Sequence, residues 1–195
     1  MNTESTFAID LPAALIRRAQ AGNRAAFEQI YRRFERPVFT LALRMLADRG
    51  EAEDVLQDTM LRLFDRVGSF RGESPFWAWL RRIAVNEALM RLRRRGLIEY
   101  TDTLVESELA IDEQRLPPAA ADHACLLRAM SELPALTRSV LWLYHGEGFT
   151  HEEIATAMDR SLSFSKSQLA RGTRRLRARL AEPAPLGALE LGQHA

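Results

Sequence analysis

The chain has 195 residues, and its 27 basic side chains nearly balance its 26 acidic ones, which leaves a formal net charge of +1. This length suits two small domains, and an apolar share of 47% excludes wholesale disorder. No apolar run reaches the ~18 residues of a membrane-spanning helix, so we expect no membrane insertion. The N-terminus lacks the pattern of a secretory signal, and Cys125 is the only cysteine. We therefore expect a cytoplasmic protein with no internal disulfide and no structural zinc site.

The near-neutral total hides a segregation of charge along the chain. Residues 1–95 carry 17 basic and 12 acidic side chains, residues 96–122 carry 1 and 7, and residues 123–195 carry 9 and 7. This pattern favours two positively charged domains joined by an acidic connector with an electrostatic role of its own. It also fits a connector that is simply solvated.

The first half of the chain has the apolar spacing of three helices. The first opens after Asn23, a good N-cap, and the second begins near Glu51 and ends at Gly68. Residues 68–75 form a loop rich in Gly, Ser and Pro, and the third helix covers residues 76–95. The predicted buried faces of the first two helices are Phe27, Ile30, Tyr31, Phe34, Val38 and Leu41, then Leu56, Met60, Leu63, Phe64 and Val67.

The second half resumes helical spacing at Cys125, after a segment with little periodicity and two adjacent prolines. Thr150 and Glu153 form a capping box that begins a short helix, and a longer basic helix begins near Ser163 and buries Leu169, Leu176 and Leu180. The predicted fold is all-α, with two small helical domains joined by a flexible acidic linker. The predicted boundaries are 1–96 for the first domain, 97–122 for the linker, 123–182 for the second domain and 183–195 for the tail.

The short helix, tight turn and longer basic helix have the layout of a helix-turn-helix, whose second helix enters the DNA major groove. In that helix Arg171 can contact guanine and Gln168 can contact adenine, whereas Arg174 and Arg175 suit phosphates. The candidate DNA-binding residues of this helix are Ser165, Lys166, Ser167, Gln168, Arg171, Arg174 and Arg175. The same pattern also fits a solvated basic helix in an ordinary bundle.

Aromatic and arginine side chains cluster around the start of the third helix. Faces for unstacked bases and cations for the backbone are what single-stranded DNA requires, and Arg82, Asn86 and Arg93 share one polar helical face. The candidates here are Phe70, Phe76, Trp77, Arg82, Asn86 and Arg93. Phe76 and Trp77 fit a core position equally well, and Trp79 fits the core better.

The second helix carries an outward-facing set of acidic and polar residues interrupted by a leucine. Asp54, Gln57, Asp58 and Leu61 follow at spacings of three and four, with Asp65 one turn further on. Such a face could dock a basic helix of a partner protein. A plain solvated face is the alternative.

The sequence offers no catalytic constellation. The segment HEEIA has Ala155 where a zinc protease needs its second histidine, and neither a phosphate-binding loop nor a Gly-x-Ser-x-Gly elbow is present. His123 and Cys125 would point about 200° apart on a helix, too far for a base and its nucleophile. We therefore expect no enzyme, no catalytic residue, no metal and no cofactor.

The ordered segments resemble a bacterial extracytoplasmic-function (ECF) RNA polymerase sigma factor of the sigma-70 family, over roughly residues 12–181. AGNRAAFEQIYRRF and AEDVLQDTMLRLF resemble conserved region two, and SFRGESPFWAWLRRIAVNEALMRLRRR resembles its promoter-melting part. LPALTRSVLWLYHGEGFTHEEIATAM resembles region four. The recognition helix departs from the family, because Ser163-Phe164-Ser165 stands where Gly-Thr-Val is usual.

This resemblance implies a factor that binds core RNA polymerase and directs initiation at promoters by recognising minus-ten and minus-thirty-five DNA elements and melting the duplex. Asp54, Gln57 and Asp58 would dock on the beta-prime clamp helices, and the beta flap is a further contact. The loop before Phe76 and the following helix would capture minus-ten bases, and Lys166, Ser167 and Arg171 would read the minus-thirty-five element. The acidic linker would lie in the polymerase channel, and such factors are commonly held inactive by an anti-sigma protein.

A second interpretation is a stand-alone helix-turn-helix transcription regulator whose N-terminal bundle is a sensor or dimerisation domain. Such a protein would bind duplex DNA tightly on its own, usually as a dimer on repeated half-sites. The promoter sequence, the regulon and the inducing signal are not readable from the residues.

Overall fold

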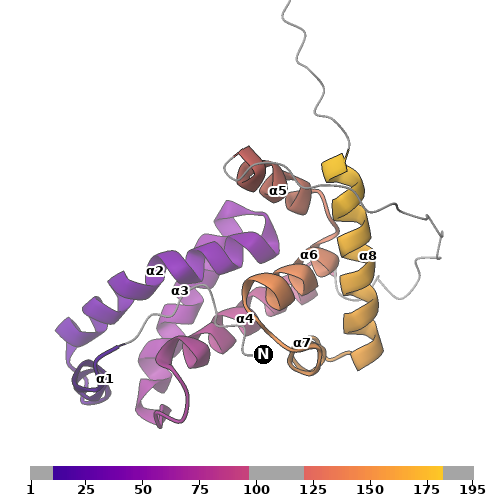
Figure 1. Cartoon of the computed structure of the whole chain (residues 1–195). Helices are drawn as coiled ribbons and strands as arrows, with labels where there is room; N and C mark the ends of the chain where they lie inside the picture. Colours follow the sequence, from indigo (N-terminus) through magenta and orange to yellow (C-terminus); the bar gives the residue numbers. More distant parts are fainter. Residues whose placement is uncertain (1–10, 97–120, 182–195) are drawn as a thin grey trace, which may run out of the picture.

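The computed structural model describes residues 11–96 and 121–181, all of whose regular elements are helical. The predicted tail and almost all of the predicted linker lie outside these residues. Figure 1 shows α2, α3 and α4 on one side of the molecule and α8 on the other, with α6 and α7 between them.

The N-terminal domain consists of α1 (Ala13–Gln20), α2 (Arg24–Leu46), α3 (Arg49–Arg66), the 3-10 turn η1 (Val67–Ser69) and α4 (Phe76–Arg94). The predicted cap of α2 is confirmed, because Asn23 Oδ1 accepts a hydrogen bond of 2.9 Å from the amide of Ala26. Ile30, Phe34 and Leu80 are fully or almost fully buried where α2 and α4 pack together. The three expected helices are therefore present, and α1 is a fourth helix that the apolar spacing did not predict.

Helix α3 differs from its prediction in its start and in its buried face. It begins at Arg49 rather than near Glu51, because Asp48 is the N-cap and accepts a hydrogen bond of 3.0 Å from the amide of Glu51. It ends at Arg66, and Gly68 lies in the following 3-10 turn. Phe64 was expected in the core but is 58% exposed, and Tyr31 of α2 is 41% exposed.

The C-terminal domain contains α5 (Ala121–Ser131), α6 (Ala135–Leu141), the π-helical turn η3 (Trp142–Gly146), α7 (His151–Met158) and α8 (Leu162–Ala181). The predicted capping box of α7 is confirmed, with Thr150 and Glu153 each bonding the other's backbone amide. Asp159 ends α7 in the left-handed conformation, at φ 55°. Helices α7 and α8 pack on one another and form the predicted helix-turn-helix.

The two domains pack against each other through a shared core. Leu136 and Val140 of α6 and Ile154 of α7 belong to the same buried cluster as the residues of α2 and α4. Helix α6 lies against α2, and α7 lies against α4 (Figure 1). Periodicity predicts which face of each helix is buried, but it does not indicate that one domain covers the other.

Candidate nucleic-acid and protein interfaces

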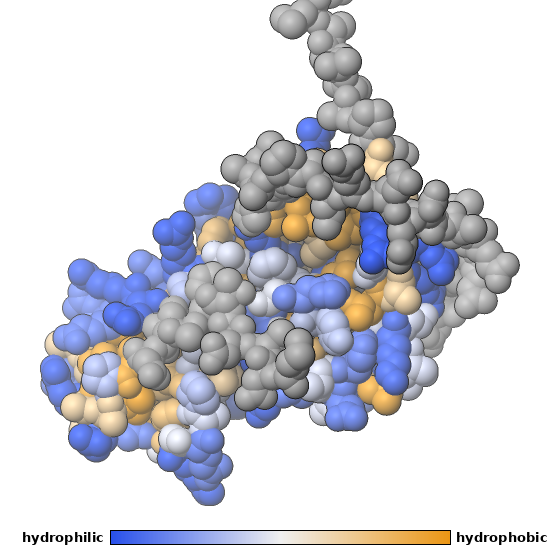
Figure 2. Space-filling model, viewed as in Figure 1, coloured by the Kyte–Doolittle hydropathy of each residue, from blue (hydrophilic) through white to orange (hydrophobic). Residues whose placement is uncertain are grey.

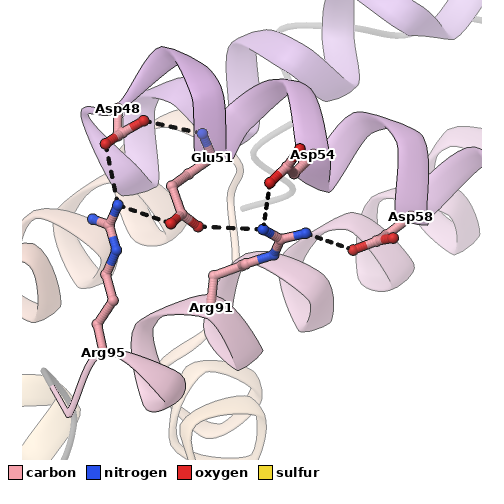
Figure 3. Close-up of polar contacts among 6 residues, drawn as sticks. All are labelled: Asp48, Glu51, Asp54, Asp58, Arg91 and Arg95. Carbon is pink, nitrogen blue, oxygen red and sulfur yellow. Dashed lines mark hydrogen bonds and ion pairs between the residues drawn. The ribbon is translucent and has the colours of Figure 1, made fainter.

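The acidic face of α3 is tied to α4 by one arginine. Arg91 donates hydrogen bonds of 2.7 Å to Asp54 Oδ2 and 2.8 Å to Asp58 Oδ2, and its Nη1 lies 3.5 Å from Glu51 Oε2 (Figure 3). The hydrogen bond to Asp58 is the chief reason that the pKa of Arg91 lies above its ordinary value. The side chains of Asp54 and Asp58 remain 55% and 41% exposed. Both carboxylates can therefore accept a further contact from a partner.

A second arginine, the C-cap residue of α4, extends this network to the start of α3. Arg95 Nη2 lies 3.1 Å from Asp48 Oδ2 and 3.0 Å from Glu51 Oε1 (Figure 3). The amide of Glu51, followed by Arg95, lowers the pKa of Asp48. These ion pairs join the start of α3 to the end of α4, two helices that also pack directly on one another.

Apolar side chains lie on the same side of the domain, next to the acidic pair. Leu61 is 66% exposed, as its outward spacing predicted, and Phe64 and Tyr31 are also exposed. Phe27 packs on Phe64 with ring centroids 4.7 Å apart, and these four residues with Gln57 and Met60 line a groove between α2 and α3. Exposed apolar surface bordered by polar residues is typical of a protein interface. Phe64 and Tyr31 were missed because helical spacing alone assigned both to the core.

Apolar surface is also visible on the space-filling view of the N-terminal domain. Figure 2 shows apolar residues reaching the surface at the end of the molecule where α1 lies, with hydrophilic residues around them. Most of the remaining visible surface of that domain is hydrophilic.

The aromatic cluster at the start of α4 is mainly a structural core. Phe76 and Trp77 are each 3% exposed, and Trp77 stacks on Phe34 with centroids 5.7 Å apart. Their predicted contact with bases is therefore wrong for this structure, because the rings fill the space between α2 and α4. Phe70 is only partly buried and packs edge-on against Phe76, at 5.1 Å. Of the predicted aromatic contacts, Phe70 alone keeps a solvent-facing surface.

The loop that carries Phe70 is held by a side chain from α1. Gln20 Nε2 donates to the carbonyl oxygen of Val67 at 3.1 Å and to that of Phe70 at 2.9 Å. The two bonds fix the backbone on which the Phe70 ring is placed.

The predicted polar face of α4 is present, and it faces α7. Arg82 Nη2 lies 3.1 Å from Glu153 Oε1, and Arg93 Nη2 donates to the carbonyl oxygen of Ala157 at 3.0 Å. Asn86 is exposed and lines a crevice between α4 and α7. The structure thus brings the three residues together, as helical spacing predicted.

Two of the predicted DNA-binding residues on the recognition helix α8 lie in the interior. Ser165 and Gln168 are 0% and 2% exposed, so their predicted contact with DNA is wrong for this structure. Gln168 Oε1 accepts a hydrogen bond of 2.8 Å from Thr137 Oγ1, and Ser165 Oγ lies 3.0 Å from His151 Nδ1. Leu169 packs against the core, as expected, but is only partly buried. The distant hydrogen-bond partners allow polar residues to take the buried position.

The other candidates on α8 keep access to solvent. Lys166, Arg174 and Arg175 are exposed, and Ser167 and Arg171 are partly exposed. Arg171 donates to Ser167 Oγ from Nε at 3.1 Å and from Nη2 at 2.5 Å. These five side chains form a basic and polar surface along the second to fourth turns of α8.

Within residues 11–96 and 121–181 no group of three or more His, Cys, Asp or Glu side chains could hold a metal ion. None of the helices in these ranges has both the length and the hydropathy that crossing a membrane requires.

Two sequence profiles match the chain, each on one of its domains. Sigma-70 region 2 matches residues 30–98, and Sigma-70 region 4 matches residues 123–176. The ECF RNA polymerase sigma-E factor of Escherichia coli K12 is 30% identical over 168 residues, which cover 80% of this chain and 87% of that protein. The chain belongs to the ECF group of sigma-70 factors. As a sigma factor, it binds core RNA polymerase and promoter DNA and directs promoter-specific transcription.

Other relatives and solved structures agree with this membership. The RNA polymerase sigma-H factor of Pseudomonas aeruginosa is 29% identical over 168 residues, which cover 80% of this chain and 87% of that protein. The sigma factor RpoE of Bartonella quintana, solved with the anti-sigma factor NepR, aligns with a TM-score of 0.54 at 25% identity, covering 79% of this chain and 96% of that one. CnrH, solved with the cytosolic domain of CnrY, aligns with a TM-score of 0.51 at 23% identity, over 85% and 94% of the two chains, and shares the fold.

Proposed function

We propose that this sigma factor divides its work among three surfaces. The exposed face of α3 binds the beta-prime clamp helices of core polymerase, the polar face of α4 with Phe70 engages the minus-ten element, and the exposed face of α8 reads the minus-thirty-five element. The N-terminal domain, residues 1–96, holds the first two surfaces, and residues 123–182 hold the third and contact the beta flap. The protein performs no chemistry of its own and acts in the cytoplasm.

One observation carries the docking proposal: acidic and apolar side chains lie together on the exposed face of α3. Asp54 and Asp58 offer carboxylates to basic side chains of a partner helix, which would set its orientation and association rate. Leu61 and Phe64 offer apolar surface next to them, and burial of that surface would supply affinity. Arg91 holds both carboxylates in place before the partner arrives.

The test should change the apolar part of the face, since reversing the charge of Asp54 or Asp58 would also break their ion pairs with Arg91. We expect Leu61→Glu to weaken binding to purified core polymerase at least tenfold by fluorescence anisotropy. Leu126→Glu is the matched control, because Leu126 is an exposed leucine on α5, outside this face. Equal affinities of the two variants would reject the docking assignment.

The DNA-binding proposal follows from what remains exposed after Phe76, Trp77, Ser165 and Gln168 are assigned to the interior. On α4, Arg82 and Arg93 supply cations for the DNA backbone and Asn86 supplies an amide for a base edge. On α8, Arg171 is placed for a base contact, and Arg174 and Arg175 are placed for phosphates. Run-off transcription with Asn86→Ala and Arg171→Ala tests whether α4 recognises the minus-ten element and α8 the minus-thirty-five element.

An anti-sigma protein is a further proposed partner. The two solved structures described above each contain a second protein, which for RpoE of Bartonella quintana is the anti-sigma factor NepR. The groove between α2 and α3 is a surface that such a protein could cover in competition with polymerase.

A further inference from the structure

The first turn of α8 carries an aromatic side chain, Phe164, that none of the three surfaces proposed above includes. Its ring packs against the buried core of the protein but is only partly buried. The ring also lines a hollow at the turn between α7 and α8, together with Ala155 and Thr156 of α7. Phe164 therefore keeps apolar surface open to solvent at the start of the recognition helix.

Contacts with its backbone and with its ring hold Phe164 in position. Ser161, the residue before α8, accepts a hydrogen bond of 3.2 Å at Oγ from the amide of Phe164, which is the contact that an N-cap serine makes. The guanidinium carbon of Arg160 lies over the ring of Phe164, 5.9 Å from its centroid. The ring is therefore held in place before any partner arrives.

Phe164 shares one face of α8 with Arg171, which is proposed above to contact a base. The two are seven residues apart with Ser167 between them, and residues at spacings of three, four and seven lie on one side of a helix. All three side chains are partly exposed, and Arg171 Nε donates to Ser167 Oγ at 3.1 Å. This face thus runs from an apolar ring in the first turn to a guanidinium two turns later.

An aromatic ring at this position has a specific partner in the major groove. A recognition helix contacts base edges through its N-terminal residues. The C5-methyl group of thymine is the apolar group that a base pair presents in the major groove, and phenylalanine is among the side chains that contact it. Ser163-Phe164-Ser165 stands where Gly-Thr-Val is usual in the family, so a large apolar ring occupies a position that usually holds threonine.

The spacing of the two side chains predicts how far apart their bases lie. Seven residues of helix span about 10 Å at ~1.5 Å per residue, which corresponds to about three base pairs at ~3.4 Å per pair. The base that Phe164 contacts should therefore lie within about three base pairs of the guanine that Arg171 contacts.

We propose that Phe164 is a specificity-determining residue of this sigma factor: its ring contacts the C5-methyl group of a thymine in the minus-thirty-five element, near the base contacted by Arg171. This inference rests on the proposed role of α8. The contact gives the protein a preference for thymine at one position of that element, because no other base carries a methyl group in the major groove.

The test removes the methyl group from the DNA and the ring from the protein. Each thymine of the upstream element, in a promoter found by run-off transcription, is replaced in turn by deoxyuridine, which lacks only the methyl group. Fluorescence anisotropy measures the affinity of the full-length protein, bound to core polymerase, for each duplex. Phe164→Ser removes the ring. Leu162→Ser is the matched control, because Leu162 is an exposed apolar residue of the same turn and lies about 200° around the helix from Phe164.

We expect one deoxyuridine to lower the affinity of the wild type about three- to fivefold, which corresponds to the loss of one buried methyl contact. The same deoxyuridine should have no effect on the affinity of Phe164→Ser and its full effect on that of Leu162→Ser. Thermal melts by circular dichroism that match the wild type confirm that both variants are folded, and the scan of the wild type depends on neither variant.

A wild type whose affinity is insensitive to every deoxyuridine would overturn the inference. A sensitivity that Phe164→Ser retains, or that Leu162→Ser also abolishes, would overturn it as well. Arg171→Ala tests the proposed role of α8 separately. If Arg171→Ala lowers affinity at particular positions while no methyl group matters, only the Phe164 contact is rejected. If Arg171→Ala leaves the affinity for every promoter unchanged, the proposed role of α8 is rejected too.

Discussion

The carboxylate of Glu147 lies 3.7 Å from the guanidinium of Arg81, across the boundary between the two domains. Only 1% and 14% of these side chains are exposed. Burial raises the pKa of Glu147 and lowers that of Arg81, since each charge has lost water. A buried pair of this kind adds little net stability, but it penalises every arrangement that leaves one charge buried alone.

Removing one charge of this pair should therefore lower the free energy of unfolding more than removing both charges. We expect Arg81→Met to lower the free energy of unfolding by about 3 kcal/mol, because Glu147 is left charged in the interior. The double variant Arg81→Met with Glu147→Gln should recover part of that loss. Urea denaturation of the wild type, the single variant and the double variant measures these free energies. A double variant no more stable than Arg81→Met would show that the two charges are not coupled.

Substitutions of Trp77 and Asn86 should distinguish residues of α4 that stabilise the fold from those that bind DNA. We expect Trp77→Ala to destabilise the protein by about 3–5 kcal/mol, since the ring is buried and stacked on Phe34. Asn86→Ala, at an exposed position, should keep the melting temperature and reduce promoter opening, which permanganate footprinting detects. A stable Trp77→Ala protein that fails only in opening would return Trp77 to the DNA interface.

Gly172 is where α8 comes closest to α6. A Cβ atom built there would lie 2.7 Å from Leu141 Cδ1 and 2.7 Å from Thr137 Cγ2. We expect Gly172→Val to lower stability by about 1–3 kcal/mol through overpacking. Gly68→Ala is the control, because a Cβ atom there meets nothing within 4 Å. Equal denaturation midpoints for the two variants would show that α8 does not pack on α6 in this way.

Arg171 and Arg175 should differ in what they contribute to DNA binding. Arg171 lies against Ser167 in the second to third turn of the recognition helix, so Arg171→Ala should cost about 1–3 kcal/mol at particular promoter positions. Arg175→Ala should weaken binding to all sequences alike. It should also reduce the slope of log affinity against log salt concentration by about one. Salt titrations of DNA affinity, on promoters with single-base changes, distinguish the two roles. If Arg171→Ala lowers the affinity for all promoters equally, Arg171 contacts a phosphate rather than a base.

The local elements were predictable from sequence because their signals are local. Asn23, and Thr150 with Glu153, begin helices through hydrogen bonds that span three residues, and both caps are confirmed. The outward position of Leu61 followed from helical spacing and is also confirmed.

The errors arose where distant parts of the chain decide the outcome. Ser165 and Gln168 are buried because His151 and Thr137 supply hydrogen-bond partners 14 and 31 residues away. Phe64 is exposed although its spacing fits the buried face, because its ring packs on Phe27 of α2 at the edge of the bundle, and helical spacing does not show where that edge lies. The contact of α7 with α4 likewise joins segments about 70 residues apart, such as Arg82 and Glu153, and no periodicity encodes it.

The most direct test of the account is run-off transcription with purified bacterial core polymerase, with and without this protein, on promoter fragments from its own genome. The account predicts discrete new transcripts that appear only with the protein, and that decrease with Leu61→Glu but not with Leu126→Glu. No new transcripts, together with a failure of the protein to co-elute with core polymerase, would contradict it.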